Sequence, residues 1–313
     1  MTLHFQSAQF LDQLRGEQES DISIADVHKI RVDSHIEPNL AGPIDPDVTI
    51  YHRFITSPTA DLPIRIYVPD ESSGPFRGMV YFHGGGWFAF NIAMYDAQLT
   101  SLAKKTNSII VAVNYQKTPE HKFPIPFDDC FSALEWIFSN ADEWNIDRHK
   151  IGVAGDSAGG NLASAVAIKA RDVGSPMVAY QLLIYPCNGM DFNTESMQAY
   201  SEGYGTTRQG IKWIWDQYLN SEEDLINPCA VPHSSNNYSG LPSTVLITAE
   251  FDVLRDDGRT YAEKLRDAGV SVSYKDYPGM IHGFFSYGEY IDEGIVVRDY
   301  LAEKINQILE PIV

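Results

Sequence analysis

The sequence is poor in cysteine. Its 313 residues include three cysteines, Cys130, Cys187 and Cys229. An odd number without a repeated spacing is a poor disulfide framework, and no group of Cys and His has the spacing of a zinc site. We therefore expect no metal site, and we expect all three cysteines to be buried as small hydrophobic residues.

The sequence also has little positive charge and no long apolar run. Lys and Arg number 23 against 42 Asp and Glu, which gives a formal net charge of −19. Such a chain is repelled by phosphate backbones and anionic membrane surfaces, although the charge could serve solubility alone. Apolar runs such as Ile109–Val113 are far shorter than the roughly 18 residues of a membrane span. We expect no nucleic-acid partner and no stable membrane association.

The N-terminal residues, Met1 to Gln6, lack a basic stretch followed by an apolar core. This pattern does not fit a signal peptide. Together with the few cysteines it predicts a reducing, cytoplasmic location.

What the sequence does have, from about residue 48 onward, is an alternation of short apolar strands and helical patterns. This alternation predicts an α/β fold with a mostly parallel sheet flanked by helices. The predicted strands are 48–56, 62–68, 78–82, 108–114, 150–154, 179–185, 244–248 and 270–277. Helical spacing is clearest at 95–104, at 161–170 and in the C-terminal stripe from Val296 to Leu309.

Two segments do not fit the alternation. Residues 1–45 are polar with short helical patterns, and residues 187–238 form a long connection between two strands, with a helical piece at 211–219. Connections of this length usually carry function. We predict that 1–45 and about 187–238 form a helical lid, or cap, on a catalytic domain that spans 46–313.

A candidate nucleophile follows the strand at 151–154. Gly155 to Gly160 read Gly-Asp-Ser-Ala-Gly-Gly and lead into a helix rich in small residues. A Gly-x-Ser-x-Gly turn between strand and helix is typical of a nucleophile elbow, which exposes Ser157 at a helix N-terminus. An ordinary glycine turn is the alternative. A phosphate-binding loop fits less well, because the Gly-Lys-Ser/Thr pattern is missing.

A candidate oxyanion hole follows the strand at 78–82, where the sequence reads His83-Gly-Gly-Gly-Trp87. Successive glycines let backbone N–H groups approach a negative oxygen without obstruction by side chains. The predicted donors are the amides of Gly85, Gly86 and Ala158. His83 is interpreted as a structural residue of this loop.

In α/β-hydrolases the catalytic residues run serine, acid, histidine along the chain. Only His233 and His282 follow Ser157. His282 lies between glycines after the last predicted strand and is the predicted base, whereas His233 is interpreted as a solvated loop residue. Asp252 follows the preceding strand and is the predicted acid, with Glu250 and Asp256 as competitors. Asp256 can also be explained as a charge at a helix start.

These residues together resemble the hormone-sensitive-lipase-like family of α/β-hydrolase carboxylesterases. The matching motifs are His83–Trp87, Gly155–Gly160, Asp252–Asp256, His282-Gly283, Asn114-Tyr115 with Pro119-Glu120, and Tyr185-Pro186. The resemblance implies a central eight-stranded sheet with a cap. It also implies hydrolysis of small-molecule esters of short to medium chain length through an acyl-enzyme, without a cofactor. Dimerisation is common in the family, so the resemblance allows a homodimer.

The sequence departs from the family pattern in three places. Val253 stands in place of a proline, Gln116-Lys117-Thr118 in place of Arg-Leu-Ala, and Ala89–Asn91 lack the usual glycine. None of them belongs to the predicted triad, but the last could alter the pocket wall.

The aromatic candidates for that wall are Trp87, Phe88, Tyr185 and Trp213, together with Trp215, for which a place in the plain core is the alternative. Two other functions stay open: an amide or formamide hydrolase, and a ligand receptor without catalysis. The plant gibberellin receptors resemble this family but lack the histidine, so the presence of His282 argues against a receptor.

Overall fold

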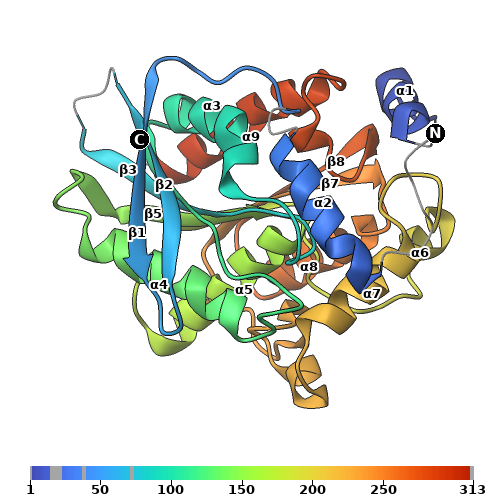
Figure 1. Cartoon of the computed structure of the whole chain (residues 1–313). Coiled ribbons are helices and arrows are strands. Elements are labelled where there is room, and N and C mark those ends of the chain that lie inside the picture. The colour runs from blue at the N-terminus through green and yellow to red at the C-terminus, as the bar shows by residue number, and fades with distance from the viewer. Residues whose placement is uncertain (1, 15–22, 37–39, 71–73, 311–313) are drawn as a thin grey trace.

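The predicted strands form one sheet in the computed structural model of the protein, which describes residues 2–14, 23–36, 40–70 and 74–310 (Figure 1). The strands are β1 (Val48–Thr56), β2 (Asp61–Pro69), β3 (Phe76–Phe82), β4 (Ser108–Val113), β5 (Ile146–Asp156), β6 (Tyr180–Ile184), β7 (Ser243–Phe251) and β8 (Val272–Ile281). Their order across the sheet is β1-β2-β4-β3-β5-β6-β7-β8. β2 is antiparallel to β1 and β4, and the other neighbours are parallel. The predicted fold class is confirmed.

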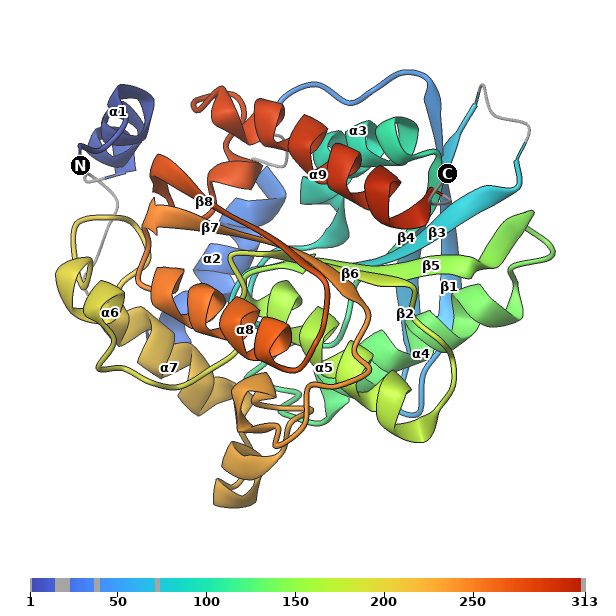
Figure 2. The same cartoon turned by 180° about the vertical axis from the view of Figure 1, so that it is seen from behind.

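Helices cover both faces of this sheet (Figures 1 and 2). The helices are α1 (Phe5–Leu14), α2 (Ile24–Ile36), α3 (Asp96–Thr106), α4 (Ile125–Ser139), α5 (Ala158–Val173), α6 (Glu195–Ala199), α7 (Arg208–Tyr218), α8 (Arg255–Asp267) and α9 (Glu293–Leu309). Side chains alternate along a strand, so Val80 and Phe82 join the core under α4, α5 and α8, and Met79 and Tyr81 join the core under α3 and α9.

The candidate catalytic residues lie at the side of the sheet where the parallel strands end. β3, β5, β7 and β8 run parallel, so their carboxyl ends meet at the same side of the molecule. These strands end at Phe82, Asp156, Phe251 and Ile281. His83, Ser157, Asp252 and His282 are therefore the first residues after four strand ends, which is where ligands of open α/β sheets bind.

The described parts of the two segments predicted to form a cap, residues 2–14, 23–36, 40–45 and 187–238, lie around this edge, and the rest of 1–45 lies outside the described residues. In α1, the ring of Phe10 packs 4.3 Å from that of Tyr287, and the His4 N–H donates to the Gly279 carbonyl. Figures 1 and 2 place α2 beside α7. The 187–238 segment contains α6, α7 and the short helices Glu222–Ile226 and Pro232–Ser234.

The cysteine prediction is right for two residues and wrong for one. All three thiols are free, and Cys130 and Cys187 are buried, but Cys229 is partly exposed. It lies in a turn of the 187–238 segment, where its N–H donates to the Asn227 side chain. Among the helices that the structure describes, none is long and apolar enough to cross a membrane. The described residues likewise contain no group of His, Cys, Asp and Glu that could hold a metal ion.

Candidate active site

Ser157 lies in a strained turn between β5 and α5. Its backbone has φ 55° and ψ −120°, a conformation that residues other than glycine rarely adopt. The turn can close this tightly because Gly155 and Gly159 have no Cβ. A Cβ at Gly155 would overlap the Gly159 carbonyl, and a Cβ at Gly159 would overlap the Phe82 carbonyl. The Ser157 N–H donates to the Ile184 carbonyl at 2.9 Å. The sequence motif therefore forms the predicted elbow and presents the serine hydroxyl at the N-terminus of α5.

The imidazole of His282 lies between the predicted nucleophile and the predicted acid. Its Nε2 is 2.9 Å from Ser157 Oγ, and its Nδ1 is 2.7 Å from Asp252 Oδ2. The other carboxylate oxygen of Asp252 accepts a hydrogen bond from the Leu254 N–H at 2.8 Å. With Nδ1–H donating to the carboxylate, the Nε2 lone pair faces the hydroxyl proton. The arrangement can remove that proton and stabilise the imidazolium that results.

The competing acids have other partners. Glu250 accepts a hydrogen bond from the Gly279 N–H at 2.8 Å. Asp256 lies in the first turn of α8, where Arg255 and Arg259 pair with its carboxylate. Its place at a helix start agrees with the alternative explanation from the sequence.

The interpretation of His233 as a solvated loop residue is wrong. The short helix Pro232–Ser234 packs its imidazole against α8, and the side chain is only 15% exposed. Nε2 lies 3.0 Å from Asp257 Oδ1, and Nδ1 lies 3.0 Å from Lys264 Nζ. His233 therefore belongs to a separate polar cluster and does not contact Ser157.

The loop after β3 presents unoccupied amides near the elbow. Gly85 and Gly86 have φ values of 97° and 58°, which suit glycine. Ala158 is the first residue of α5, so its N–H has no partner within the helix. In the part of the chain that the structure describes, no protein acceptor takes a hydrogen bond from these three amides. They are free to bind an oxyanion.

Asp156 is a site residue that sequence reasoning quoted only as part of a motif. Its buried carboxylate accepts hydrogen bonds from the hydroxyls of Tyr81 and Tyr95 and from the Gly84 N–H, at 2.8, 3.0 and 3.0 Å. Burial raises the pKa of Asp156 to about 6, although these hydrogen bonds favour its charged form. The carboxylate fastens the loop after β3 to the residue before the nucleophile. An acidic residue at the end of an apolar strand was the available signal.

The predicted pocket aromatics divide into two groups. The Tyr185 ring lies 4.7 Å from the His282 ring, and Phe88 meets Trp213 edge-on with ring centroids 5.1 Å apart. Trp87 is fully buried and stacks on Tyr218 at 4.2 Å, with Trp215 also close by. Tyr185, Phe88 and Trp213 are thus placed near the loops of the site. Trp87 and Trp215 form part of the packed core behind them.

Comparisons with known proteins agree with this geometry. A protein family described by its alpha/beta hydrolase fold matches residues 79–286. The chain is 37% identical to the carboxylesterase NlhH of Mycobacterium tuberculosis over 230 residues, which cover 72% of each protein. It is also 37% identical to the arylesterase of Saccharolobus solfataricus over 230 residues, which cover 72% of this chain and 73% of that protein.

Among solved structures, the ester-hydrolase EH1AB1 from the metagenome of Lake Arreo superimposes with a TM-score of 0.92 at 30% identity. That superposition covers 98% of this chain and 99% of the other. The chain therefore belongs to the hormone-sensitive-lipase-like family of α/β-hydrolase carboxylesterases, which are carboxylic ester hydrolases.

Proposed function

We propose that the protein hydrolyses short- to medium-chain carboxylic esters through an acyl-enzyme formed on Ser157. The observation that supports this proposal is the unbroken hydrogen-bonded series from Asp252 through His282 to Ser157. Ser157 Oγ attacks the ester carbonyl carbon while its proton passes to His282 Nε2. Asp252 holds the imidazole in the required tautomer and stabilises its positive charge.

The reaction then proceeds in two steps, acylation of Ser157 and hydrolysis of the acyl-enzyme. The tetrahedral intermediate places its negative oxygen against the amides of Gly85, Gly86 and Ala158. His282 gives its proton to the leaving alcohol, which frees the alcohol and leaves the acyl group on Ser157. His282 next takes a proton from water, the resulting nucleophile attacks the acyl carbon, and the carboxylic acid departs as Ser157 recovers its proton. These steps use groups of the chain itself, and we expect no cofactor.

The organisation around the site is part of the same proposal. Residues 1–45 and about 187–238 act as the cap over the catalytic domain, with Phe88 and Trp213 lining the route to Ser157. β8 lies at one edge of the sheet, opposite β1, and can pair with a second copy in a homodimer. We expect the protein to act in the cytoplasm on small esters.

A panel of p-nitrophenyl esters of rising chain length, run beside the matching p-nitroanilide, tests the proposal. We expect kcat/KM to be highest for acetate to hexanoate, to fall for dodecanoate, and to be negligible for the anilide. Faster turnover of the anilide would favour the amide hydrolase. Binding of esters without any turnover would favour the receptor. Either result would contradict the proposed esterase.

The pH dependence of kcat/KM should report His282. Burial alone would lower the pKa of the imidazole, but the charge and hydrogen bond of Asp252 outweigh burial and raise it above its usual value. Only the neutral imidazole can accept the serine proton, so activity should be lost as pH falls through this raised pKa. The acid limb should therefore have its midpoint above about 6.5, the ordinary value for histidine. Full activity near pH 5 would contradict a histidine base.

A further inference from the structure

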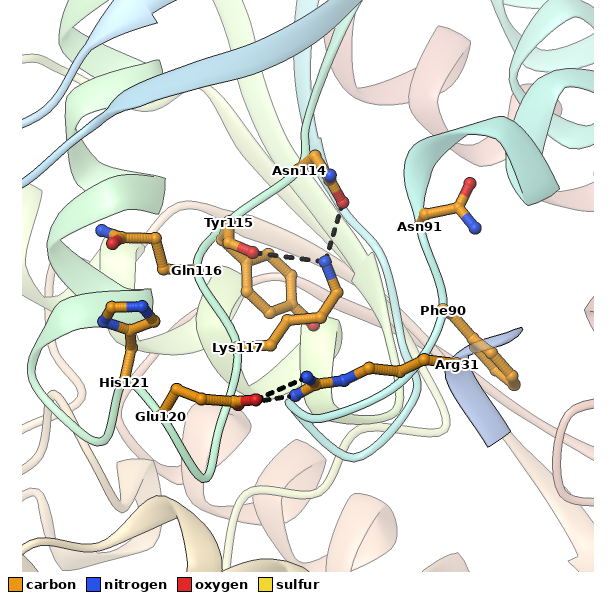
Figure 3. Close-up of a pocket in the computed structure, with 9 residues that line it drawn as sticks. All are labelled: Arg31, Phe90, Asn91, Asn114, Tyr115, Gln116, Lys117, Glu120 and His121. Carbon is orange, nitrogen blue, oxygen red and sulfur yellow. Dashed lines mark hydrogen bonds and ion pairs between the residues drawn. The ribbon is translucent and has the colours of Figure 1, made fainter. Parts of the chain in front are cut away.

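Arg31 connects helix α2 to two loops at the carboxyl edge of the sheet. Its Nε donates to the Phe88 carbonyl at 2.7 Å, and its Nη2 donates to the Thr118 carbonyl at 2.6 Å. Nη1 and Nη2 also donate to the two carboxylate oxygens of Glu120, at 2.7 and 2.8 Å (Figure 3). One planar guanidinium thus holds acceptors in three residues, all more than 50 positions away in the sequence.

The Phe88 carbonyl belongs to the loop that carries the predicted oxyanion amides. The N–H groups of Phe88 and Ala89 both donate to the Gly85 carbonyl, at 3.1 and 2.8 Å. Thr118 N–H donates to the Trp87 carbonyl at 3.1 Å, so the second loop is bonded to the first. Arg31 therefore contacts the same backbone turn, Gly85 to Ala89, that contains the predicted donors Gly85 and Gly86. Glycine can adopt the left-handed conformations of these two residues, and others, at little cost, so the contacts around the loop select the direction in which the two amides point.

The other cap segment contacts the same place. The Phe88 ring packs edge-on against Trp213 of α7, and Ile214 lies against the open side of Gly86. The loop is thus held by α2 through a hydrogen-bonded cation and by α7 through apolar packing. Helices from two separate segments of the chain meet at Phe88.

The guanidinium of Arg31 also borders a pocket. A cavity of about 410 Å³ lies beside the guanidinium, and Phe90, Tyr115 and Lys117 line it (Figure 3). The pocket is lined by residues on the far side of the guanidinium from Phe88, so the contacts of Arg31 with the Phe88 and Thr118 carbonyls form its polar anchor on the loop side.

The two kinds of contact differ in strength. The Glu120 side chain is 55% exposed, and an ion pair so open to water contributes little by itself. The bonds to the two carbonyls are partly buried and charge-assisted, which makes them the stronger contacts. Hydrogen bonding from Arg31 lowers the pKa of Glu120 to about 2, so Glu120 stays charged throughout the pH range in which His282 titrates.

We propose that Arg31 is a positioning residue for the oxyanion loop, which we define as residues 83–89. The contacts of Arg31 with the Phe88 and Thr118 carbonyls hold this loop in the conformation that orients the amides of Gly85 and Gly86. Loss of these contacts loosens the loop. The inference rests on the proposed function, because it assigns these amides to the tetrahedral intermediate.

The test compares Arg31→Ala, Arg31→Lys and Glu120→Gln in the full chain, with p-nitrophenyl acetate as a small substrate. We expect Arg31→Ala to lower kcat about tenfold to a hundredfold, less than the loss of an oxyanion donor itself, with KM little changed. Lysine keeps the positive charge but lacks the planar set of N–H donors of the guanidinium, so the kcat of Arg31→Lys should lie between those of the wild type and Arg31→Ala. Glu120→Gln keeps both carbonyl contacts and should retain most of kcat. The control is Lys29→Ala, which removes an exposed pair with Asp33 on the same helix.

A second readout locates the defect at the oxyanion. A trifluoromethyl ketone adds to the serine and places a negative oxygen in the oxyanion hole. Its inhibition constant for the Arg31 variants should therefore rise by the same factor by which kcat falls. A kcat equal to that of the wild type, a rise in KM alone, or an unchanged inhibition constant would each overturn the proposal. If Arg31→Ala does not fold, Arg31→Lys decides by the same criteria. Hydrolysis by the wild type and none by Ser157→Ala would leave the proposed function standing whatever Arg31 does.

Discussion

Replacing Ser157 with alanine should lower kcat for p-nitrophenyl acetate by a factor on the order of 10⁶, the loss typical of a serine nucleophile. The reason is that no other hydroxyl takes its place at 2.9 Å from His282 Nε2 among the residues that the structure describes. A fluorophosphonate probe gives an independent measurement. It should add its mass to Ser157 in the wild type and fail to label the variant.

Folding should survive this change. The hydrogen bond from Ser157 to the Ile184 carbonyl uses the backbone, so alanine retains it. Ser132→Ala is the matched control, since that hydroxyl donates to the Asp128 carbonyl within its own helix α4, away from the site. The control should be fully active and should unfold near the wild-type temperature. Turnover by a folded Ser157→Ala protein would remove Ser157 as the nucleophile.

Replacing His282 with alanine should have an effect of similar size, again on the order of 10⁶ in kcat, because serine and histidine act as one unit. Adding Ser157→Ala to this variant should therefore cost almost nothing further. Steady-state rates of the two single variants and the double variant measure this non-additivity directly. Losses that multiply in the double variant would show that the two side chains work independently, against the proposed mechanism.

His233→Ala is the control for this result. The variant should keep its kcat, because the His233 imidazole faces Asp257 and Lys264. It should lose about 1–3 kcal/mol of unfolding free energy, since Asp257 Oδ1 loses its contact with the imidazole and keeps only the longer bond from the Asn188 N–H at 3.3 Å. Denaturant unfolding measures the loss. An inactive His233→Ala protein together with an active His282→Ala protein would show that His233, and not His282, is the base.

The strands were the most predictable part of the fold. β1 has the predicted bounds although most of its side chains are exposed, and the strands of the parallel core, which are buried on both faces, were recognised as apolar runs. β5 was predicted to begin at residue 150 but begins at Ile146. Its first residues include the charged Asp147 and Arg148, which hide the strand, and backbone pairing with β3 forms it. β8 was predicted to end at residue 277 but continues to Ile281, because it pairs again with β7 at Phe251 after a shift in register.

The site residues could be predicted where a short sequence motif, or the order of residues along the chain, identifies them. A strand end followed by Gly-x-Ser-x-Gly, and the sequence order serine, acid, histidine, point to Ser157, Asp252 and His282 without coordinates, with Glu250 and Asp256 left as competitors for the acid. The contacts of Arg31 and His233 could not be found in this way. They join residues that are distant in the chain, and no periodic pattern records which carbonyl or carboxylate a side chain reaches. The shifted pKa of Asp156 likewise depends on its burial among Tyr81 and Tyr95.

The aromatic cluster between the oxyanion loop and α7 gives the protein an internal fluorescent reporter. Three of its five tryptophans, Trp87, Trp213 and Trp215, gather where α7 meets this loop. Trp87 and Trp215 are fully shielded from water, and indole emission moves to longer wavelength when the ring becomes hydrated. Displacement of α7 would hydrate these rings and red-shift the fluorescence. Motion of this part of the molecule can therefore be followed in stopped-flow experiments on the unlabelled protein.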